Sequence, residues 1–502
     1  MRLRLVAHVD GLLLRAFGVF LLLPMLVDWG YGNWDSSIGF LIAALSAAAF
    51  GELAKRMAPR GEELHRVEGI MVVASAWLVV SFFSAIPYLW NGLSVIDSLF
   101  ESMSGLTTTG ATIFTNFSQY GEGLYLWRSM TQWFGGMGVI ALFIAVLPRL
   151  AIAGRQMFFA EAPGPQEERL TPRIRHTAIA LWSLYIGLTI IQVVALVTVG
   201  MPIFDAVCNS LTTVAAGGFS PNPQSIGGYA NPAAEWVFVF FIFLAGANYS
   251  LQYRAIRGRP LDLFRDEEFR AYALLVIVAT LLLTYVLLPF NRDPSLEYLS
   301  ANTSLGVLTE APPLTVLRQA AFQVLTIVTT AGFATDDFNL WNDEARVVLL
   351  ILMFVGGSAG SAAGGPKVVR VLLIFKYAAA ELVRVLHPRA VNPVRFNRRV
   401  VPPKVLRSIV TVLLLYILVF ILSVLMVTVF GADILTAITA SIATLGNIGP
   451  GFSVVGPMGT YAAFPTSTKV VLFLNMWIGR LEVITVLVLL QPAVWRRLSP
   501  TN

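Results

Sequence analysis

The sequence predicts an all-α protein that crosses a membrane many times and is built from four related units. Its 502 residues are 56% hydrophobic and only 13% charged, a composition that is too apolar for soluble domains. Long apolar segments alternate with short loops along the chain. Four of these loops carry a similar run of Thr and Gly, roughly a hundred residues apart, and such spacing indicates an internal structural repeat.

The chain divides into an N-terminal appendage and the four units. Two apolar segments, near 11–29 and 37–54, carry no Thr/Gly run, so residues 1–65 are predicted to form an extra pair of transmembrane helices. The repeated units are predicted at 66–150, 151–260, 261–390 and 391–502. Each contains an outer span, a short apolar segment, the Thr/Gly loop and a second span.

The short segments before the loops decide the architecture. They cover about 97–109, 205–216 and 318–330, and the first has 13 residues. At a rise of 1.5 Å per residue, such a helix cannot cross a hydrocarbon core of about 30 Å. We therefore expect half-helices that enter the membrane and return through the loops. Non-helical backbone at that depth is stable only where it lines a water-filled path, so the four units are predicted to surround a central pore.

The four runs are regularly placed relative to polar residues. In the first three, a polar residue precedes the glycine by 13 positions: Asp97 before Gly110, Asp205 before Gly218, and Gln319 before Gly332. In the fourth run, Asp433 lies 13 positions before Gly446 and 16 before Gly449. This spacing predicts an insertion in the fourth run and leaves both of its glycines as candidates.

Basic residues predict the orientation of the chain. Lys and Arg gather in the loops 51–66, 149–175, 254–270 and 367–407, while the loops with the Thr/Gly runs contain almost none. By the positive-inside rule, the basic loops face the cytoplasm and the Thr/Gly runs face the outside. The net charge of +6 therefore reflects membrane topology, and no nucleic-acid partner is expected.

The chemistry of the runs favours a monovalent cation. A dehydrated cation needs several oxygens in place of its water, and backbone carbonyls supply them where glycine permits the required conformation. None of the runs has Asp or Glu between its Thr cluster and its glycine, which argues against a ring of carboxylates. The half-helices would also direct their partially negative C-terminal ends at the ion.

A glycine-rich break interrupts the second span of the third unit. Residues 356–367 contain a proline and five glycines: Gly356, Gly357, Gly360, Gly364 and Gly365. Because glycine and proline both disfavour helix, we expect a flexible loop near the middle of the membrane, acting as a gate. The alternative is a close-packed interface of small residues.

Arg480 is predicted to be the second part of the gate. It lies near the middle of the last apolar span, where a guanidinium costs at least ~2.5–3.5 kcal/mol on insertion scales, so a functional role is expected. If Arg480 faces the pore, its charge forms a barrier to cations. The alternative is an ion pair with another span. Glu482 is an unsuitable partner, because residues two apart point to different sides of a helix.

The chain resembles the Trk/Ktr/HKT superfamily of potassium transporters over nearly its whole length, and most of all the membrane subunit of bacterial Trk uptake systems. The segments that carry the resemblance are Gln132 to Gly138, Val328 to Phe333, Gly356 to Lys367, Leu445 to Gly451 and Gly479 to Glu482. The family pattern places one filter glycine in each repeat, and Gly446 competes with Gly449 for the fourth place. The potassium site that the resemblance implies comprises Thr108, Thr109, Gly110, Ala216, Gly217, Gly218, Thr330, Ala331, Gly332, Asn447, Ile448 and Gly449.

The resemblance also implies the biological setting. It implies uptake of potassium ions (K+) across the bacterial inner membrane, with the filter loops facing the periplasm. It further implies a homodimer in the lipid bilayer and a TrkA-like cytoplasmic regulatory subunit that binds NAD or ATP. The alternative is a sodium-permeable or ion-coupled (K+/H+ or Na+) transporter of the same superfamily. Gly rather than Ser at position 110 favours potassium.

An intramembrane enzyme is the rival from a different class. The stretch from Gly357 to Gly360 has a superficial similarity to the nucleophile turn of serine hydrolases. A general base is missing, because His8, His65, His176 and His387 all fall near span ends or in cytoplasmic loops, where none can activate Ser358. With a single cysteine, Cys208, a CxxC metal site is also excluded. The sequence therefore predicts that the protein is not an enzyme.

Overall fold

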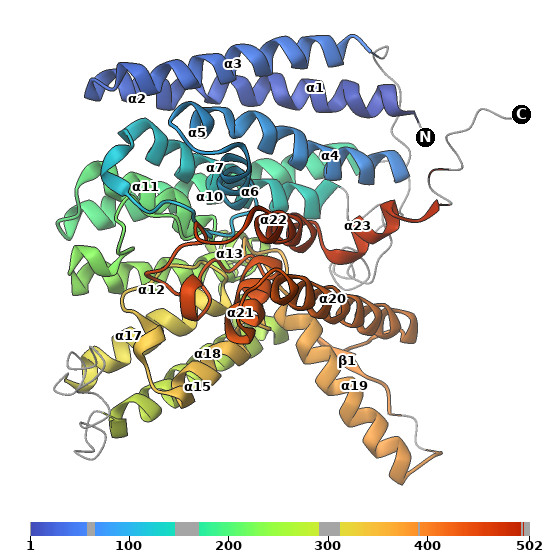
Figure 1. The fold of residues 1–502 in the computed structure, drawn as a ribbon. Helices are drawn as coiled ribbons and strands as arrows, with labels where there is room; N and C mark the ends of the chain where they lie inside the picture. Colours follow the sequence, from blue (N-terminus) through green and yellow to red (C-terminus); the bar gives the residue numbers. More distant parts are fainter. Residues whose placement is uncertain are drawn as a thin grey trace, which may run out of the picture.

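The computed structural model describes residues 2–57, 66–145, 170–290, 312–389, 392–492 and 495. Within these ranges the protein is built almost entirely of helices (Figure 1), and its one sheet is the hairpin formed by β1 (Arg395–Phe396) and β2 (Arg399–Val400). Six of the described helices are long and apolar enough to cross a membrane, and two bent helix pairs pass the same test. The predicted all-α, multi-pass architecture is confirmed.

The N-terminal appendage forms the outermost layer of the molecule in Figure 1. Helices α1 (Leu3–Phe20) and α2 (Leu22–Tyr31) together form one span of 29 residues, and α3 (Trp34–Lys55) packs along them. The spans extend beyond the predicted 11–29 and 37–54. The charged residues that lowered the local hydropathy are paired, since Arg15 bonds Glu52 at 2.6 Å and Asp10 accepts a bond from Ser75 at 2.6 Å.

Four units follow, each with an outer span, a short helix, a loop and a second span. The first contains α4 (Arg66–Ser84), α5 (Ile86–Trp90), α6 (Val95–Leu106), η1 (Phe117–Gln119) and α7 (Glu122–Ala145). The second contains α10 (Leu170–Thr198), α11 (Ile203–Val214), η2 (Gly227–Tyr229), α12 (Pro232–Gly246) and α13 (Tyr249–Ile256).

The third and fourth units repeat the plan. The third contains α14 (Leu261–Arg265), α15 (Glu267–Phe290), α17 (Pro313–Val328), η4 (Phe338–Leu340), α18 (Asp343–Leu352) and α19 (Val368–Leu386). The fourth contains α20 (Pro403–Val429), α21 (Ile434–Leu445), η5 (Ser453–Val455), α22 (Thr466–Arg480) and α23 (Val483–Leu489). The unit boundaries at 65, 150 and 390 lie at segments outside the described residues, so they stay predictions.

The predicted half-helices are present. Helices α6, α11 and α21 have 12 residues each, and α17 has 16, which is too short to cross a hydrocarbon core of about 30 Å. The second spans of three units support the half-helix of the next unit around the molecule, since α7 packs on α11, α12 on α17 and α22 on α6. This packing brings the C-terminal ends of the half-helices together.

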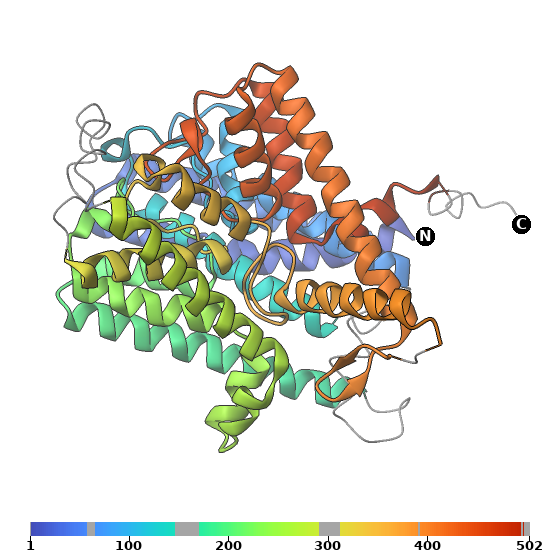
Figure 2. The same ribbon diagram turned by 90° about the horizontal axis from the view of Figure 1, so that it is seen from below.

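Second spans break in three of the four units. The break between α18 and α19 falls on the glycine-rich segment, which forms a loop near the centre of the molecule in Figure 2. The bends of 106° between α12 and α13 and of 108° between α22 and α23 were not predicted. Arg480 therefore ends α22 rather than lying inside a continuous span, and Glu482 leaves the helical region with φ +62°. Hydropathy misses these bends because apolar residues continue on both sides.

Candidate functional site

The four Thr/Gly loops adopt one backbone conformation. Two positions before each ring glycine, a residue takes the left-handed conformation, which is uncommon outside glycine: Thr108 (φ 52°), Ala216 (54°), Thr330 (56°) and Asn447 (55°). The glycines themselves also have positive φ: Gly110 (81°), Gly218 (83°), Gly332 (73°) and Gly449 (100°). The internal repeat seen in the sequence is therefore a repeat of local geometry.

These four glycines form a closed ring. The Cα of each glycine lies against a backbone carbonyl of the next unit, so that an added Cβ would come within 3.0 Å of it: Gly110 against Gly217, Gly218 against Ala331, Gly332 against Ile448, and Gly449 against Thr109. The order of contacts runs from the first unit to the fourth and back to the first. We call these four loops the glycine ring. It brings together all twelve residues of the predicted potassium site.

The fourth position of the ring belongs to Gly449. Gly449 follows the last residue of α21 by four positions, as Gly110 follows the last residue of α6. Gly446 has helical φ of −80° and caps α21. The predicted insertion is wrong, because it matched residues that are not equivalent: Asp433 is the N-cap of α21, while Asp97 lies in the first turn of α6.

Side chains from neighbouring helices hold the ring. Gln132 on α7 donates from Nε2 to the Gly217 carbonyl at 2.6 Å and accepts from the Phe219 amide at 3.1 Å. Asn447 donates to the Thr109 hydroxyl and to the Met476 carbonyl, both at 3.0 Å. The Tyr461 hydroxyl donates to the Gly449 carbonyl at 2.7 Å. Because these groups are buried, the ring is fixed by hydrogen bonds that water does not weaken.

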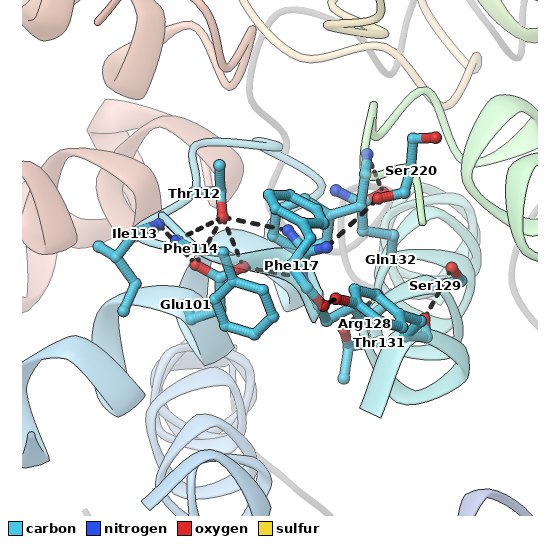
Figure 3. Close-up of polar contacts among 12 residues, drawn as sticks. Glu101, Thr112, Ile113, Phe114, Phe117, Arg128, Ser129, Thr131, Gln132 and Ser220 are labelled. Carbon is cyan, nitrogen blue, oxygen red and sulfur yellow. Dashed lines mark hydrogen bonds and ion pairs between the residues drawn. The ribbon is translucent and has the colours of Figure 1, made fainter. Parts of the chain in front are cut away.

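A buried ion pair packs next to the first loop of the ring (Figure 3). The Arg128 Nε donates to Glu101 Oε1 at 2.8 Å, and both side chains are at most 2% exposed. Glu101 also accepts bonds from the Thr112 hydroxyl at 3.0 and 3.2 Å and from the Ile113 amide at 2.9 Å. The carboxylate thus fixes the chain that leaves the ring after Gly110.

Arg128 connects this loop to the second one. Its guanidinium lies 4.0 Å from the centroid of the Phe219 ring and 4.4 Å from that of Phe114, and it donates to the Ser220 carbonyl at 3.4 Å. A depression is lined by all four ring glycines and by Arg128. Sequence reasoning missed this pair, although a Glu and an Arg within apolar segments that flank a pore loop are themselves a signal.

Asp336 and Asp337 lie just after the third loop. Asp337 caps η4 by accepting the Asn339 amide at 3.1 Å, and Asp336 accepts the Trp341 indole N–H at 3.2 Å. These contacts give both carboxylates a structural role in the turn that follows the third loop.

The glycine-rich segment 356–367, which we call the intramembrane loop, packs against the ring. The Gly364 amide donates to the Thr330 hydroxyl at 2.6 Å, and an added Cβ on Gly364 would lie 3.0 Å from that of Asn447. Gly360 and Gly365 have positive φ of 73° and 63°. Gly356 and Gly357 pack without room for a side chain, against Gly364 and Ala363.

The bend in the second unit binds this loop. Gly246 at the end of α12 accepts the Ser358 amide at 2.9 Å, and Ala245 accepts the Ala362 amide at 3.2 Å. Asn248, the N-cap of α13, donates to the Ala359 carbonyl at 2.8 Å. The loop is therefore close-packed and hydrogen-bonded in this arrangement, a state that fits both the packing and the gate interpretations of the sequence.

Arg480 joins the intramembrane loop to α7. Its two terminal nitrogens donate to the Ala362 carbonyl at 3.1 Å and to the Gly135 carbonyl at 3.2 Å. Across the described parts of the chain it forms no ion pair, which removes the alternative of a partner carboxylate there. Glu482 bonds Arg370 at 2.6 Å instead. The guanidinium lies buried, next to Gly479, which packs against the end of α21.

Comparison with known proteins identifies the family. Residues 38–496 match the sequence pattern of the TrkH family, described as cation transport proteins. The chain belongs to the TrkH family. Family membership places it among cation transport proteins.

Similar TrkH-family proteins match over their full lengths. The Trk system potassium uptake protein TrkH of Salmonella typhimurium is 38% identical over 99% of this chain and 100% of its own. TrkG of Escherichia coli K12 is 31% identical over 98% and 99% of the two chains. The crystal structure of the potassium transporter TrkH from Vibrio parahaemolyticus superposes with a TM-score of 0.87 at 34% identity, covering 99% of this chain and 100% of that one.

Proposed function

We propose that this protein takes up potassium through a pore in which the glycine ring is the selectivity filter. The observation that carries the proposal is the closed, four-part ring of identical loop backbones. Such loops offer carbonyl oxygens without fixed charge, as a dehydrated monovalent cation requires. The four half-helices end at the ring and add their partially negative C-terminal dipoles. The names of the relatives, which are potassium uptake proteins, support potassium as the ion.

The intramembrane loop and Arg480 form the proposed gate. On the inner side of the ring, Ala362, Lys367 and Arg480 are at most 6% exposed, which fits a closed pore. The Arg480 charge also opposes a cation that has passed the ring. In this proposal, opening requires the loop to leave the bonds it makes to Arg480 and Thr330.

The orientation in the membrane is inferred from charge, and the partners are inferred from the family resemblance. The basic loops indicate that the ring opens to the periplasm of a bacterial inner membrane. The basic loop 149–175 lies largely outside the described residues, while 254–270 and most of 367–407 are described. We further propose a homodimer and a cytoplasmic nucleotide-binding subunit, as the resemblance implies. Co-purification of these components tests both.

Reconstitution in liposomes tests the proposed function. With a potassium gradient across the bilayer, the purified protein should carry K+ faster than Na+, and it should restore growth at low potassium to an uptake-deficient bacterial strain. Flux no greater than in empty liposomes, in both wild type and gate variants, would contradict the proposal. A flux that needs a proton or sodium gradient would favour the coupled alternative.

Shortening the intramembrane loop tests the gate. Removing residues 360–363 takes away the carbonyl that Arg480 holds, so basal flux should increase. If the shortened protein inserts correctly and its flux and its regulation stay unchanged, the loop serves packing alone.

A further inference from the structure

Glu268 is a buried carboxylate that lies outside the ring and contacts the intramembrane loop. It is the second residue of α15 and is 5% exposed. Its Oε1 accepts the Ala359 amide at 2.6 Å and the Val369 amide at 3.3 Å. Leaving a buried amide without an acceptor is costly, because that amide stays removed from water. A single side chain thus bonds both the middle of the loop and the helix that follows it.

This attachment is separate from the one made by Arg480. Glu268 holds the loop at Ala359, while Arg480 holds it three residues later, at Ala362. Lys367, the charged residue within the loop itself, donates to the Ala363 and Gly364 carbonyls. The loop is therefore anchored by two buried polar side chains at two points, one on α22 and one on α15.

Glu268 is also connected to the cytoplasmic hairpin β1–β2. Asn397, at the hairpin turn, accepts the Glu267 amide and donates to the Asp266 carboxylate, both at 2.9 Å. Lys376 on α19 bonds Glu267 and the Arg395 carbonyl. The two residues that precede Glu268 are thus fixed to the hairpin, which lies at the periphery of the molecule in Figure 2.

We propose that Glu268 is a positioning residue that holds the intramembrane loop closed, and that displacement of the hairpin 395–400 releases it. The inference rests on the proposed gate. A contact on the hairpin would move Asp266 and Glu267 through Asn397, and this movement would withdraw the Glu268 carboxylate from Ala359. The hairpin is then the point at which the cytoplasmic side of the protein acts on the pore.

Substitution of Glu268 tests the anchor. Removing the shared acceptor of the buried Ala359 and Val369 amides shifts a two-state equilibrium by about tenfold or more, so Glu268→Ala should raise basal K+ flux in liposomes by about that factor. Glu268→Gln keeps an oxygen acceptor and should lie between Glu268→Ala and wild type. The ratio of K+ to Na+ flux should stay unchanged, because the ring is not touched. Glu344→Ala, which removes an exposed carboxylate on α18, is the matched control.

The loop-shortened protein separates failure of the anchor from failure of the gate. In that background Glu268→Ala should add nothing, since two changes that act through one element are not additive. A shortened loop that raises flux, together with wild-type flux in Glu268→Ala, overturns the anchor and leaves the gate. A shortened loop without effect overturns both. An undiminished effect of Glu268→Ala in the shortened protein shows that Glu268 acts elsewhere.

Asn397→Ala tests the hairpin link without removing the buried Glu268 side chain, and it serves where Glu268→Ala does not fold. Basal flux should rise by a few-fold, in the same direction as in Glu268→Ala and with unchanged ion selectivity. Wild-type flux in Asn397→Ala overturns the link to the hairpin. A changed selectivity would show that the effect passes through the ring, which also overturns it.

Discussion

The glycine ring and the intramembrane loop use glycine in different ways. In the ring, all four copies have a left-handed residue two positions before the glycine, and each glycine contacts the backbone of the next unit. The loop occurs once, and side chains hold it, among them Asn248, Glu268 and Arg480. The repeated backbone contacts hold the glycine ring in one arrangement. The side-chain hydrogen bonds of the intramembrane loop can break and form again with other partners. We therefore expect changes in the ring to alter selectivity and changes around the loop to alter flux.

The largest effect is expected behind the ring, at the buried ion pair. Glu101→Ala leaves Arg128 charged, buried and without its carboxylate, a change that costs roughly 3–5 kcal/mol. Thermal unfolding in detergent should show a strongly lowered midpoint. Arg384→Ala, which breaks an exposed pair with Glu381, is the control and should cost about 0–1 kcal/mol. Equal midpoints for the two variants would show that the Glu101 pair does not stabilise the fold.

The ring itself is tested by Gly110→Ser. A serine there would take a left-handed conformation at a cost of about 1–3 kcal/mol, and its Cβ would overlap the Gly217 carbonyl. We expect the ratio of K+ to Na+ flux to fall by roughly tenfold, since each 1.4 kcal/mol is a factor of ten. The protein should still insert in the membrane. An unchanged ratio in the inserted variant would remove Gly110 from the filter.

Around the loop, substitutions of Arg480 distinguish the effect of its charge on flux from the effect of its packing. Arg480→Gln removes the positive charge and should increase K+ flux several-fold at equal surface expression, with unchanged selectivity. Arg480→Lys keeps the charge and should stay closer to wild type. Flux that is lower than or equal to wild type in a folded Arg480→Gln protein would refute the barrier and leave Arg480 as a structural tie between the loop and α7.

The sequence was sufficient for the features that depend on local composition. Apolar length predicted the spans, the short segments predicted the half-helices, and glycine and proline predicted the break at 356–367. Gly110, Gly218 and Gly332 were found because each follows a polar residue of its short segment by 13 positions. The structure places these glycines in one ring through contacts between units, and no single unit carries that information.

The features that were missed depend on contacts between distant segments. Glu101 and Arg128 lie 27 positions apart, and neither sequence neighbourhood shows that the two meet. Glu268 looked like part of a cytoplasmic basic loop, because its bonds to residues 91 and 101 positions away leave no local trace. The bend after Arg480 was hidden because apolar residues resume at Val483. Asp433 was misaligned because a capping aspartate and a first-turn aspartate look alike in a sequence.

The smallest effect is expected at Gly446, and it sharpens the assignment of the fourth ring position. Gly446 has a helical φ of −80°, a conformation that alanine also adopts. At such a position Gly→Ala stabilises the fold by about 0.4–1 kcal/mol, because it lowers the conformational entropy of the unfolded chain. The nearest atoms to an added Cβ are the Ile442 carbonyl oxygen at 2.9 Å and the Ile448 side chain at 3.1 Å, and both belong to the fourth unit itself rather than to a neighbouring loop of the ring. Gly446→Ala should therefore leave the ratio of K+ to Na+ flux at its wild-type value. Gly449→Ala, with φ of 100° and the Thr109 carbonyl against its Cα, should lower that ratio as strongly as Gly110→Ser does. The opposite result, with selectivity lost in Gly446→Ala and kept in Gly449→Ala, would transfer the fourth filter position to Gly446.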